Sequence, residues 1–292
     1  MRWPEGFIAV DWGTTNRRAY RIDGDGRCGD EFEDDRGVLS ISGGDFGAAV
    51  AEIRSRLGDR PLLLAGMVGS NRGWIEAPYV PCPAGVEEVA GALVWADEHT
   101  AIVPGVCDPR RADVMRGEEV QLLGAIGEGM VPADALVCHP GTHNKWAEVA
   151  GGRIATFRTI MTGELFNLLR EHSVLSDLLV EPAEPGEAFD AGVRDGLAGD
   201  IQAQLFSVRS RVLLGKARRE DAPSYTSGLL IGGDVRLGLE SAAPATQIVI
   251  MGRPELTRLY ASAIAVAGRD PVELDGERCF LAGIRQIAER IE

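Results

Sequence analysis

The sequence predicts an α/β protein made of two similar halves, each with a turn suited to binding phosphate. One observation is a repeated string, Gly-Thr-x-Asn followed by a basic residue, which begins at Gly13 and again at Gly141. Each copy lies between a short apolar run and an alternating stretch, so each predicts a β-hairpin. A second observation is a glycine-containing tight turn ten residues after each copy begins. Both halves are therefore predicted to run strand, polar turn, strand, tight turn, strand, and then helix.

The first predicted hairpin spans residues 8–22 and turns at Gly13, Thr14, Thr15 and Asn16. Gly13 lets the backbone approach an anion closely, and the amides and threonine hydroxyls of the turn converge as donors. Asp11, at the end of the first strand, suits a hydrated Mg²⁺, because this ion keeps most of its waters and takes only one or two carboxylates. One copy alone fits an ordinary hairpin equally well. The second copy favours a nucleotide held between two halves.

A glycine-rich loop at 66–74 follows a predicted helix at 45–57 and a buried strand at 61–65. It comes directly after a strand's carboxyl end, where open α/β sheets bind ligands. Arg72 suits bidentate contact with a carboxylate. The loop offers four side chains to a ligand: Ser70, Asn71, Arg72 and Trp74. The alternative is a solvated surface loop, and the position of the loop favours binding.

The first half is predicted to end with a short helix at 85–95 and a strand at 100–106, and we place its boundary at residues 1–112. The next stretch is acidic at its start and then apolar on one stripe, which predicts a helix. Asp113 and Glu118 are candidates for a general base, a task that suits a carboxylate when a hydroxyl loses its proton. The helix dipole explains acidic residues here equally well, and Asp11 is a third candidate.

The second half, predicted at 113–292, contains the second hairpin at 135–149. Its turn offers Gly141, Thr142, His143 and Asn144 to a phosphate. Lys145 suits the neutralisation of a transferred phosphoryl group. His139 and His143 have no third ligand nearby, so they are poor evidence for zinc and fit phosphate contact better.

Helices dominate the rest of the second half. One is predicted to start near residue 163, and two more, at 188–198 and 201–214, form a helical insertion near 175–222 that the first half lacks. A strand at 247–251 then turns through Gly252 into another helix. Glycine at such a turn lets the backbone come close to a purine or its phosphates.

The composition limits the partners of the chain. The 292 residues allow two domains, and a net charge of −14 argues against nucleic acid or an anionic membrane surface. No apolar run approaches the eighteen or so residues of a membrane span. Five cysteines without a C-x-x-C motif indicate neither a disulfide framework nor a zinc site. We expect a cytoplasmic protein. Its oligomeric state is left open, and a homodimer is one of the states allowed.

The paired hairpins resemble those of the actin-like ATPase and sugar-kinase superfamily, where one hairpin serves each side of a nucleotide cleft. Within it, the chain is similar to the 2-dehydro-3-deoxygalactonokinase family at 66–74, 113–119, 139–146 and 161–166. The strings His-Pro-Gly-Thr-His-Asn-Lys-Trp and Met-Thr-Gly-Glu-Leu-Phe are the most particular of these. The resemblance implies a duplicated actin-like, or ribonuclease H-like, fold with mixed five-stranded sheets around a central nucleotide cleft.

The same resemblance implies a kinase that uses ATP and Mg²⁺ to phosphorylate the 6-hydroxyl of 2-dehydro-3-deoxy-D-galactonate. It favours Glu118 as the base, because a similar Gly-Glu-Glu string is catalytic in related exopolyphosphatases. Arg18 is expected beside Arg72 at the sugar acid. Adenosine is expected near four residues: Gly232, Gly233, Asp234 and Gly252. The rivals are a kinase for hexoses or amino sugars, an exopolyphosphatase-type hydrolase, and an ATP-binding regulatory or assembly protein.

Overall fold

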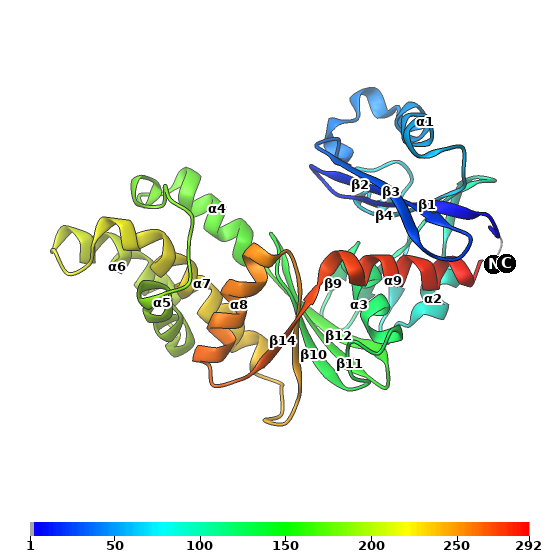
Figure 1. The fold of residues 1–292 in the computed structure, drawn as a ribbon. Helices are drawn as coiled ribbons and strands as arrows, with labels where there is room; N and C mark the ends of the chain where they lie inside the picture. The colour runs from blue at the N-terminus through cyan, green and yellow to red at the C-terminus, as the bar shows by residue number, and fades with distance from the viewer. Residues whose placement is uncertain (1–2, 292) are drawn as a thin grey trace. The chain divides into compact units, whose positions relative to one another are not determined.

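The computed structural model describes residues 3–291, and its first sheet has six strands in the order β3-β2-β1-β4-β7-β6 (Figure 1). The strands are β1 (Gly6–Trp12), β2 (Arg17–Asp23), β3 (Cys28–Asp34), β4 (Leu62–Gly66), β6 (Val94–Asp97) and β7 (Thr100–Ile102). β1 and β2 form the predicted hairpin, and β1, β4 and β7 run parallel. The sheet has one strand more than expected, because the helix α2 (Val86–Gly91) is shorter than predicted and β6 follows it.

The core of this sheet lies against α1 (Phe46–Leu57), whose buried positions repeat with helical spacing. The carboxylate of Asp45 caps α1 by accepting the N–H of Ala48 at 2.9 Å. Three short 3₁₀ helices accompany the sheet: η1 (Val38–Ser40), η2 (Ser42–Gly44) and η3 (Met67–Gly69). A smaller sheet contains β5 (Tyr79–Pro81), β8 (Gly105–Asp108) and β9 (Asp113–Met115).

Two further helices, α3 (Glu118–Gly127) and α9 (Gly276–Glu289), pack against each other through glycines. A Cβ atom on Gly124 would overlap the carbonyl of Cys279, and one on Gly283 would overlap the carbonyl of Val120. Glycine at both crossings therefore lets the two backbones touch. Phe280 of α9 also packs on Tyr20 of β2, with ring centroids 5.9 Å apart.

The second sheet repeats the plan of the first, with five strands in the order β12-β11-β10-β13-β14. The strands are β10 (Ala135–His139), β11 (Asn144–Ala150), β12 (Arg153–Ile160), β13 (Ile248–Gly252) and β14 (Pro271–Asp275). β13 runs parallel to both β10 and β14. Three consecutive strands followed by two later parallel strands thus occur twice in the chain, which confirms the predicted duplication.

The helices of the second half include the predicted insertion. They are α4 (Thr162–His172), α5 (Glu187–Ala198), α6 (Ile201–Leu213), α7 (Ala222–Leu239) and α8 (Pro254–Val266), with η4 (Ser176–Leu178) and η5 (Arg219–Asp221) between them. α5, α6 and α7 lie side by side (Figure 1). No helix between residues 3 and 291 combines the length and apolar character needed to cross a membrane.

The chain forms two compact units, and each is described here by itself. The first contains the residues up to 133, 149–156, and those from 277 onward; the second contains 134–148 and 157–276. The chain thus passes between the units four times, and α3 and α9 belong to the first unit. The single division expected at residues 112–113, as a boundary between a sugar-acid domain and an ATP domain, stays a prediction.

Candidate functional site

The turn of the first hairpin is exposed and braced from behind. The amide of Gly13 donates to the carbonyl of Asn16 at 2.9 Å, which closes the turn. The amides of Gly37 and Val38 donate to the carbonyls of Thr15 and Gly13 at 2.9 and 3.0 Å. A Cβ atom on Gly37 would overlap the backbone of the turn, so only glycine fits there. These contacts leave the side chains of the turn exposed to solvent, and no local sequence pattern indicates the role of Gly37.

The basic residue that ends each Gly-Thr-x-Asn string points into the protein. Arg17 has no exposed surface; it pairs with Asp34 at 2.7 Å and lies 5.3 Å from the ring centre of Trp12. Burial alone would raise the pKa of the Asp34 carboxyl, but the hydrogen bond and charge of Arg17 hold it below its ordinary value. Arg17 therefore supports the hairpin rather than a ligand.

Asp11 and Arg18 are opposite each other in the β1–β2 ladder, and Arg18 is opposite Glu33 of β3. The guanidinium of Arg18 lies 3.2 Å from the carboxylate of Glu33. Burial opposes the charge of Arg18, yet Glu33, Tyr20 and Asp11 together raise its pKa. Arg18 is thus occupied by neighbouring carboxylates, which weakens its predicted role as a ligand for the sugar acid.

The loop after β4 brings backbone close to Asp11. Gly66 has a φ of +90°, and a Cβ atom built on it would lie 3.5 Å from Oδ1 of Asp11. Gly117, with a φ of +105°, approaches the same glycine, since its Cβ atom would lie 3.4 Å from the Cα of Gly66. The first hairpin, the 66–74 loop and the start of α3 therefore meet within the first unit.

Within the 66–74 loop, the four predicted ligand residues divide into two kinds. Ser70 is buried; its hydroxyl donates to the carbonyl of Met67 at 2.7 Å and accepts the amide of Arg72 at 3.2 Å, so it holds the turn. Trp74 stacks on Phe46 with ring centroids 6.2 Å apart and packs against the core. Asn71 and Arg72 are exposed. The prediction of a binding loop therefore rests on these two side chains.

The start of α3 holds two adjacent carboxylates in different environments. Glu118 is half-buried and accepts the amide of Arg116 at 3.0 Å. Glu119 has no exposed surface and accepts the amide of Gly117 at 2.9 and 2.7 Å. Burial, and then the charge of Glu118, raises the pKa of Glu119 to about 8. Two neighbouring carboxyls in such different environments suit different tasks.

Glu119 and Arg116 lie in the 113–119 stretch, and no role was predicted for either from the sequence. The guanidinium of Arg116 donates to the carbonyl of Ala77 at 2.8 Å and lies 4.4 Å from the ring centre of Tyr79. It thereby ties the start of α3 to the segment after the 66–74 loop. Asp113 begins β9 opposite Asp108, and its carboxylate accepts the amide of Val114 at 2.8 Å. Asp113 thus lies in β9, whereas Glu118 lies beside Gly117 at the start of α3.

The turn of the second hairpin is braced by the start of α4. A Cβ atom on Gly163 would lie 2.6 Å from the carbonyl oxygen of Gly141 and 2.8 Å from the Cα of Thr142. The amide of Glu164 donates to the carbonyl of Thr142 at 3.0 Å, and its carboxylate lies 2.5 Å from Nε2 of His143. Gly163 therefore lets the helix rest directly on the turn.

Asn144 and Lys145 support this turn from inside. Lys145 is 4% exposed, and its ammonium group donates to the carbonyl of His143 at 3.2 Å. The amide group of Asn144 donates to both oxygens of Asp234, at 2.9 and 3.1 Å. Asn144 was predicted to contact phosphate, but its side chain is occupied by Asp234. The side chain of Lys145 thus ends directly beneath the turn.

Asp234 is a buried centre of hydrogen bonding. Besides Asn144, it accepts hydrogen bonds from Trp146, Thr162 and Tyr260. Burial raises the pKa of Asp234, and these donors oppose that rise. Its side chain joins the second hairpin, α4, α7 and α8, which gives it a structural role, and its expected contact with adenosine stays a prediction.

Gly232 and Gly233 also serve packing rather than a ligand. A Cβ atom on Gly232 would overlap the carbonyl of Val193 in α5, and one on Gly233 would overlap the side chain of Ile201 in α6. Both positions lie inside α7 and have no room for adenosine. Gly252 differs, because it ends β13 with a φ of +151° and lies near the carbonyl of Pro140 in the second hairpin.

A cavity of about 350 Å³ opens beside the second hairpin, within the second unit. Gly141 and Gly163 line one end of it, and the rest is mainly apolar, with Phe166, Leu230 and Leu256 from α4, α7 and α8. An apolar cavity with a few polar groups is typical of a small-molecule site. The cavity has space for a flat apolar group, and it adjoins a turn suited to phosphate.

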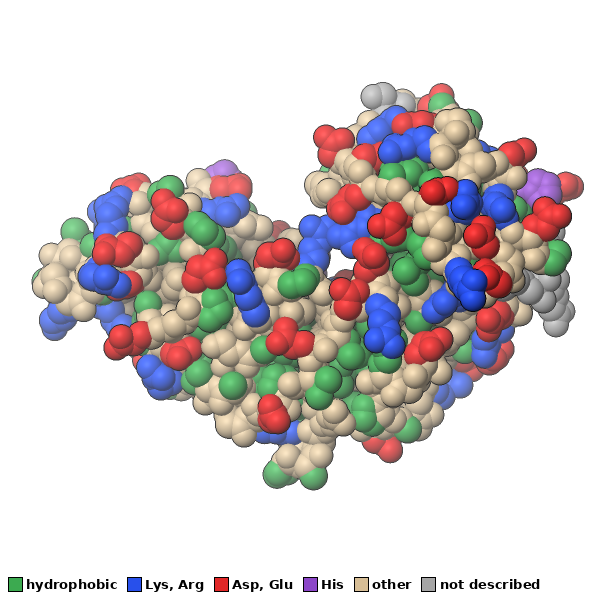
Figure 2. All heavy atoms as spheres, viewed as in Figure 1, with side chains coloured by type: hydrophobic (Ala, Val, Ile, Leu, Met, Phe, Trp, Pro, Cys, Tyr) green, Lys and Arg blue, Asp and Glu red, His purple; other side chains and the backbone are tan. Residues whose placement is uncertain are grey.

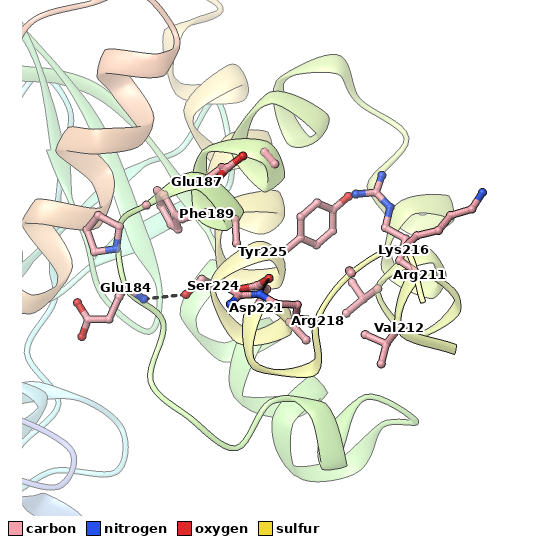
Figure 3. A pocket seen from close by; sticks show the side chains of 17 residues that line it. Glu184, Glu187, Phe189, Arg211, Val212, Lys216, Arg218, Asp221, Ser224 and Tyr225 are labelled. Carbon is pink, nitrogen blue, oxygen red and sulfur yellow. Dashed lines mark hydrogen bonds and ion pairs between the residues drawn. The ribbon is translucent and has the colours of Figure 1, made fainter. Parts of the chain in front are cut away.

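A larger cavity, of about 720 Å³, lies at α5, α6 and the start of α7 (Figure 3). Both arginines that line it are held by carboxylates: Arg211 lies 3.0 Å from Asp195 and 4.6 Å from the ring centre of Tyr225. Arg218 makes two hydrogen bonds to Asp221, at 2.9 and 2.7 Å. Neither hairpin lines this cavity. Size alone therefore does not identify the site, and the smaller cavity is the candidate.

Comparison with known proteins gives one consistent result. A sequence model of the 2-keto-3-deoxy-galactonokinase family matches residues 11–287. The chain is 38% identical over 290 residues to the 2-dehydro-3-deoxygalactonokinase of Escherichia coli K12, and the match covers 98% of each chain. A crystal structure assigned to this kinase in Sinorhizobium meliloti superposes with a TM-score of 0.91 at 32% identity, covering 98% of this chain and 99% of the other. Component A of the Acidaminococcus fermentans (R)-2-hydroxyglutaryl-CoA dehydratase shares the fold alone, with a TM-score of 0.53 at 10% identity over 98% and 99% of the two chains.

Proposed function

This chain belongs to the 2-keto-3-deoxy-galactonokinase family and is a sugar-acid kinase, and we propose that it transfers the terminal phosphoryl group of ATP to the 6-hydroxyl of 2-dehydro-3-deoxy-D-galactonate. The observation that carries the proposal is the full-length match to this family together with two braced Gly-Thr turns, at Gly13 and Gly141. ATP is abundant in the cytoplasm, which supports a cytoplasmic enzyme.

We propose that the two turns hold the phosphates of one ATP and that the cavity beside the second turn holds its adenosine. Gly141 lines both the turn and the cavity, which supports a base in the cavity and phosphates at the turn. Thr14 and Thr142 are exposed, so their hydroxyls are available to phosphate oxygens, whereas the hydroxyl of Thr15 donates to Oδ1 of Asn16 at 2.9 Å. Lys145, beneath the second turn, would favour the negative charge that the transferred group carries.

A magnesium ion fits the donors of the first unit. Residues 3–291 contain no cluster of three or more His, Cys, Asp or Glu side chains placed to hold a metal. Mg²⁺ does not require such a cluster, because it keeps several waters and is held by one or two carboxylates and the substrate's phosphates. Asp11 would hold it through water, and the ion would neutralise phosphate charge.

We propose that the sugar acid binds at the 66–74 loop and the start of α3. The guanidinium of Arg72 would bind the carboxylate, and Asn71 would bind a hydroxyl. Glu118 would accept the proton of the reacting hydroxyl, ahead of Asp113 and Asp11, because it lies beside Gly117, whose backbone approaches Gly66 of the loop. Glu119 would hold the Gly117 turn in place.

The test is coupled ADP release measured over a panel of phosphoryl acceptors. The panel contains 2-keto-3-deoxy sugar acids of both C4 configurations, neutral hexoses, amino sugars and polyphosphate. We expect a sugar acid to raise ADP release well above the rate with ATP alone, and the galactonate-derived acid to give the highest kcat/KM. Turnover by a neutral sugar alone, or ADP release unaffected by every acceptor, would refute the proposal.

A further inference from the structure

The helix α6 presents apolar side chains to solvent. Phe206, Leu213 and Leu214 are each 65% to 70% exposed. Phe206 and Leu213 are two helical turns apart, so they lie on one face. Val208, on another face of α6, is buried with Leu175 and other leucines. α6 therefore has one face in the core of the second unit and a second apolar face without a partner.

The unpartnered apolar surface continues onto the segment that follows α4. The guanidinium of Arg209 donates to the carbonyl of Val174 at 3.3 Å, so this segment lies along α6. Val174 is 64% exposed. Large apolar side chains grouped in this way mark an interaction surface more often than isolated ones do. We call these four residues, Val174, Phe206, Leu213 and Leu214, the α6 surface.

Opposite charges flank the two parts of the α6 surface. Residues 201–219 contain five Lys or Arg and no Asp or Glu, although the whole chain has a net charge of −14. Residues 171–187 contain five Asp or Glu and no Lys or Arg. Basic, acidic and hydrophobic side chains lie close together at the α6 end of the second unit (Figure 2). One part of the surface is thus basic and apolar, and the adjacent part is acidic and apolar.

Several of these charges have no ion pair within the part of the chain that the structure describes. Lys216 and Arg219 on the basic side, and Asp177 and Glu181 on the acidic side, form no ion pair with any residue between 3 and 291. Arg219 donates only to the backbone carbonyl of Asp177. These four side chains are therefore available to a partner.

We propose that the α6 surface binds the same surface of a second copy of this chain, related by a two-fold axis. In a two-fold interface the same patch meets itself in opposite orientation, so the basic part of one copy faces the acidic part of the other. Apolar side chains then bury one another, and the unpaired charges find partners at the rim. An anionic membrane would attract residues 201–219 but repel residues 171–187, which disfavours that occupant.

Sedimentation velocity of the full chain over a range of protein concentrations tests this proposal. The wild type should sediment as a dimer at high concentration. Phe206→Gln combined with Leu213→Gln should raise the dissociation constant about tenfold or more, because both apolar anchors are lost. Leu39→Gln removes an equally exposed apolar side chain in the first unit, so its dissociation constant should match that of the wild type.

Charge reversal supplies a second, independent readout. Lys216→Glu and Glu181→Lys should each weaken the dimer, and a chain carrying both changes should recover most of the lost affinity, since the two-fold pairing is restored. A wild type that stays monomeric at every concentration, or a dimer unaffected by the Phe206 and Leu213 changes, would overturn the proposal. So would binding of the wild type, but not of Phe206→Gln, to vesicles of anionic lipid.

Discussion

Arg72 is the exposed cation of the 66–74 loop, and its guanidinium pairs with no carboxylate in the described part of the chain. A bidentate contact to a substrate carboxylate would add a charge-assisted hydrogen bond worth about 1.5–3 kcal/mol. We therefore expect Arg72→Ala to raise KM for the sugar acid about tenfold to a hundredfold and to change KM for ATP much less. Steady-state kinetics with each substrate varied in turn measure this.

The matched control is Arg194→Ala, which removes another exposed arginine, in α5 of the second unit. It should leave both KM values unchanged. If Arg72→Ala also leaves KM for the acid unchanged, Arg72 does not bind the substrate carboxylate and the binding role of the loop would rest on Asn71 alone.

Glu118 is the proposed general base, and its removal should affect the chemical step. A positioned base contributes about 10²- to 10⁴-fold, so Glu118→Gln should lower kcat by about that factor, with small changes in both KM values. Asp113→Asn is the comparison, because Asp113 lies in β9 rather than beside Gly117. A larger loss of kcat in Asp113→Asn than in Glu118→Gln would transfer the role to Asp113.

Glu119 should make the stability of the protein depend on pH. Its pKa is about 8 in the folded protein and near its ordinary value of 4.5 in the unfolded chain. The folded state therefore binds one more proton between these values, so the free energy of unfolding decreases as pH rises through this window. Glu119→Gln removes this titration, and it should reduce the fall in Tm between about pH 5.5 and pH 8.5 by about 3 °C or more.

Thermal unfolding at a series of pH values measures the effect of Glu119. Glu128→Gln, at the exposed C-terminal end of the same helix, is the control and should retain the slope of the wild type. Equal slopes for Glu119→Gln and the wild type would mean that Glu119 is ionised in the folded protein at neutral pH.

At the level of residues, the sequence indicated the turn positions better than the direction of each side chain. Gly13, Thr14, Gly141 and Thr142 do form two exposed or half-exposed turns. Asn144 and Asp234 were expected at the nucleotide, but they bind each other in the interior. A polar residue next to a turn can face either way, and only the partner 90 residues away in the sequence decides which.

At the level of elements, α5 and α7 pack closely through four glycines. Gly192 and Gly196 of α5 meet the backbone of α7, and Gly228 and Gly232 of α7 meet the backbone of α5. Gly232→Ala should therefore lower the free energy of unfolding by about 1–3 kcal/mol, because an added methyl group forces the two helices apart. Chemical denaturation monitored by circular dichroism measures the loss.

The control for this packing is Gly47→Ala in α1. Its Cβ atom would meet only Oδ1 of Asp45, at an ordinary 3.7 Å. Alanine is the better helix former, so this variant should be as stable as the wild type or more stable. Equal stability of Gly232→Ala and the wild type would show that the helices can separate without cost.

The order of the elements could largely be predicted, because strands and helices follow local periodicity. Two features could not. A single apolar window does not separate a helix from an edge strand, so β6 was predicted as part of a helix. The glycines of α7 lie in an apolar helical window, and their pairing with α5 depends on a segment some 40 residues earlier, which no local pattern reveals.

At the level of the whole molecule, a chain with a net charge of −14 is proposed to bind two anions. Local groups oppose the repulsion between the acidic chain and these anions. Lys145 lies beneath one turn, Arg72 is exposed in the 66–74 loop, and backbone amides line both turns. The repeated strand order could be anticipated from the repeated strings. The use of both repeats by one nucleotide is the central proposal.

A crystal structure of the chain with a non-hydrolysable ATP analogue, Mg²⁺ and 2-dehydro-3-deoxy-D-galactonate tests that claim most directly. Our account predicts that phosphate oxygens of one nucleotide accept hydrogen bonds from backbone amides of both turns, at 13–16 and at 141–143. It also predicts adenosine in the cavity lined by Gly141 and Phe166. A nucleotide whose phosphates contact only one turn, with the other turn facing solvent, would contradict the account.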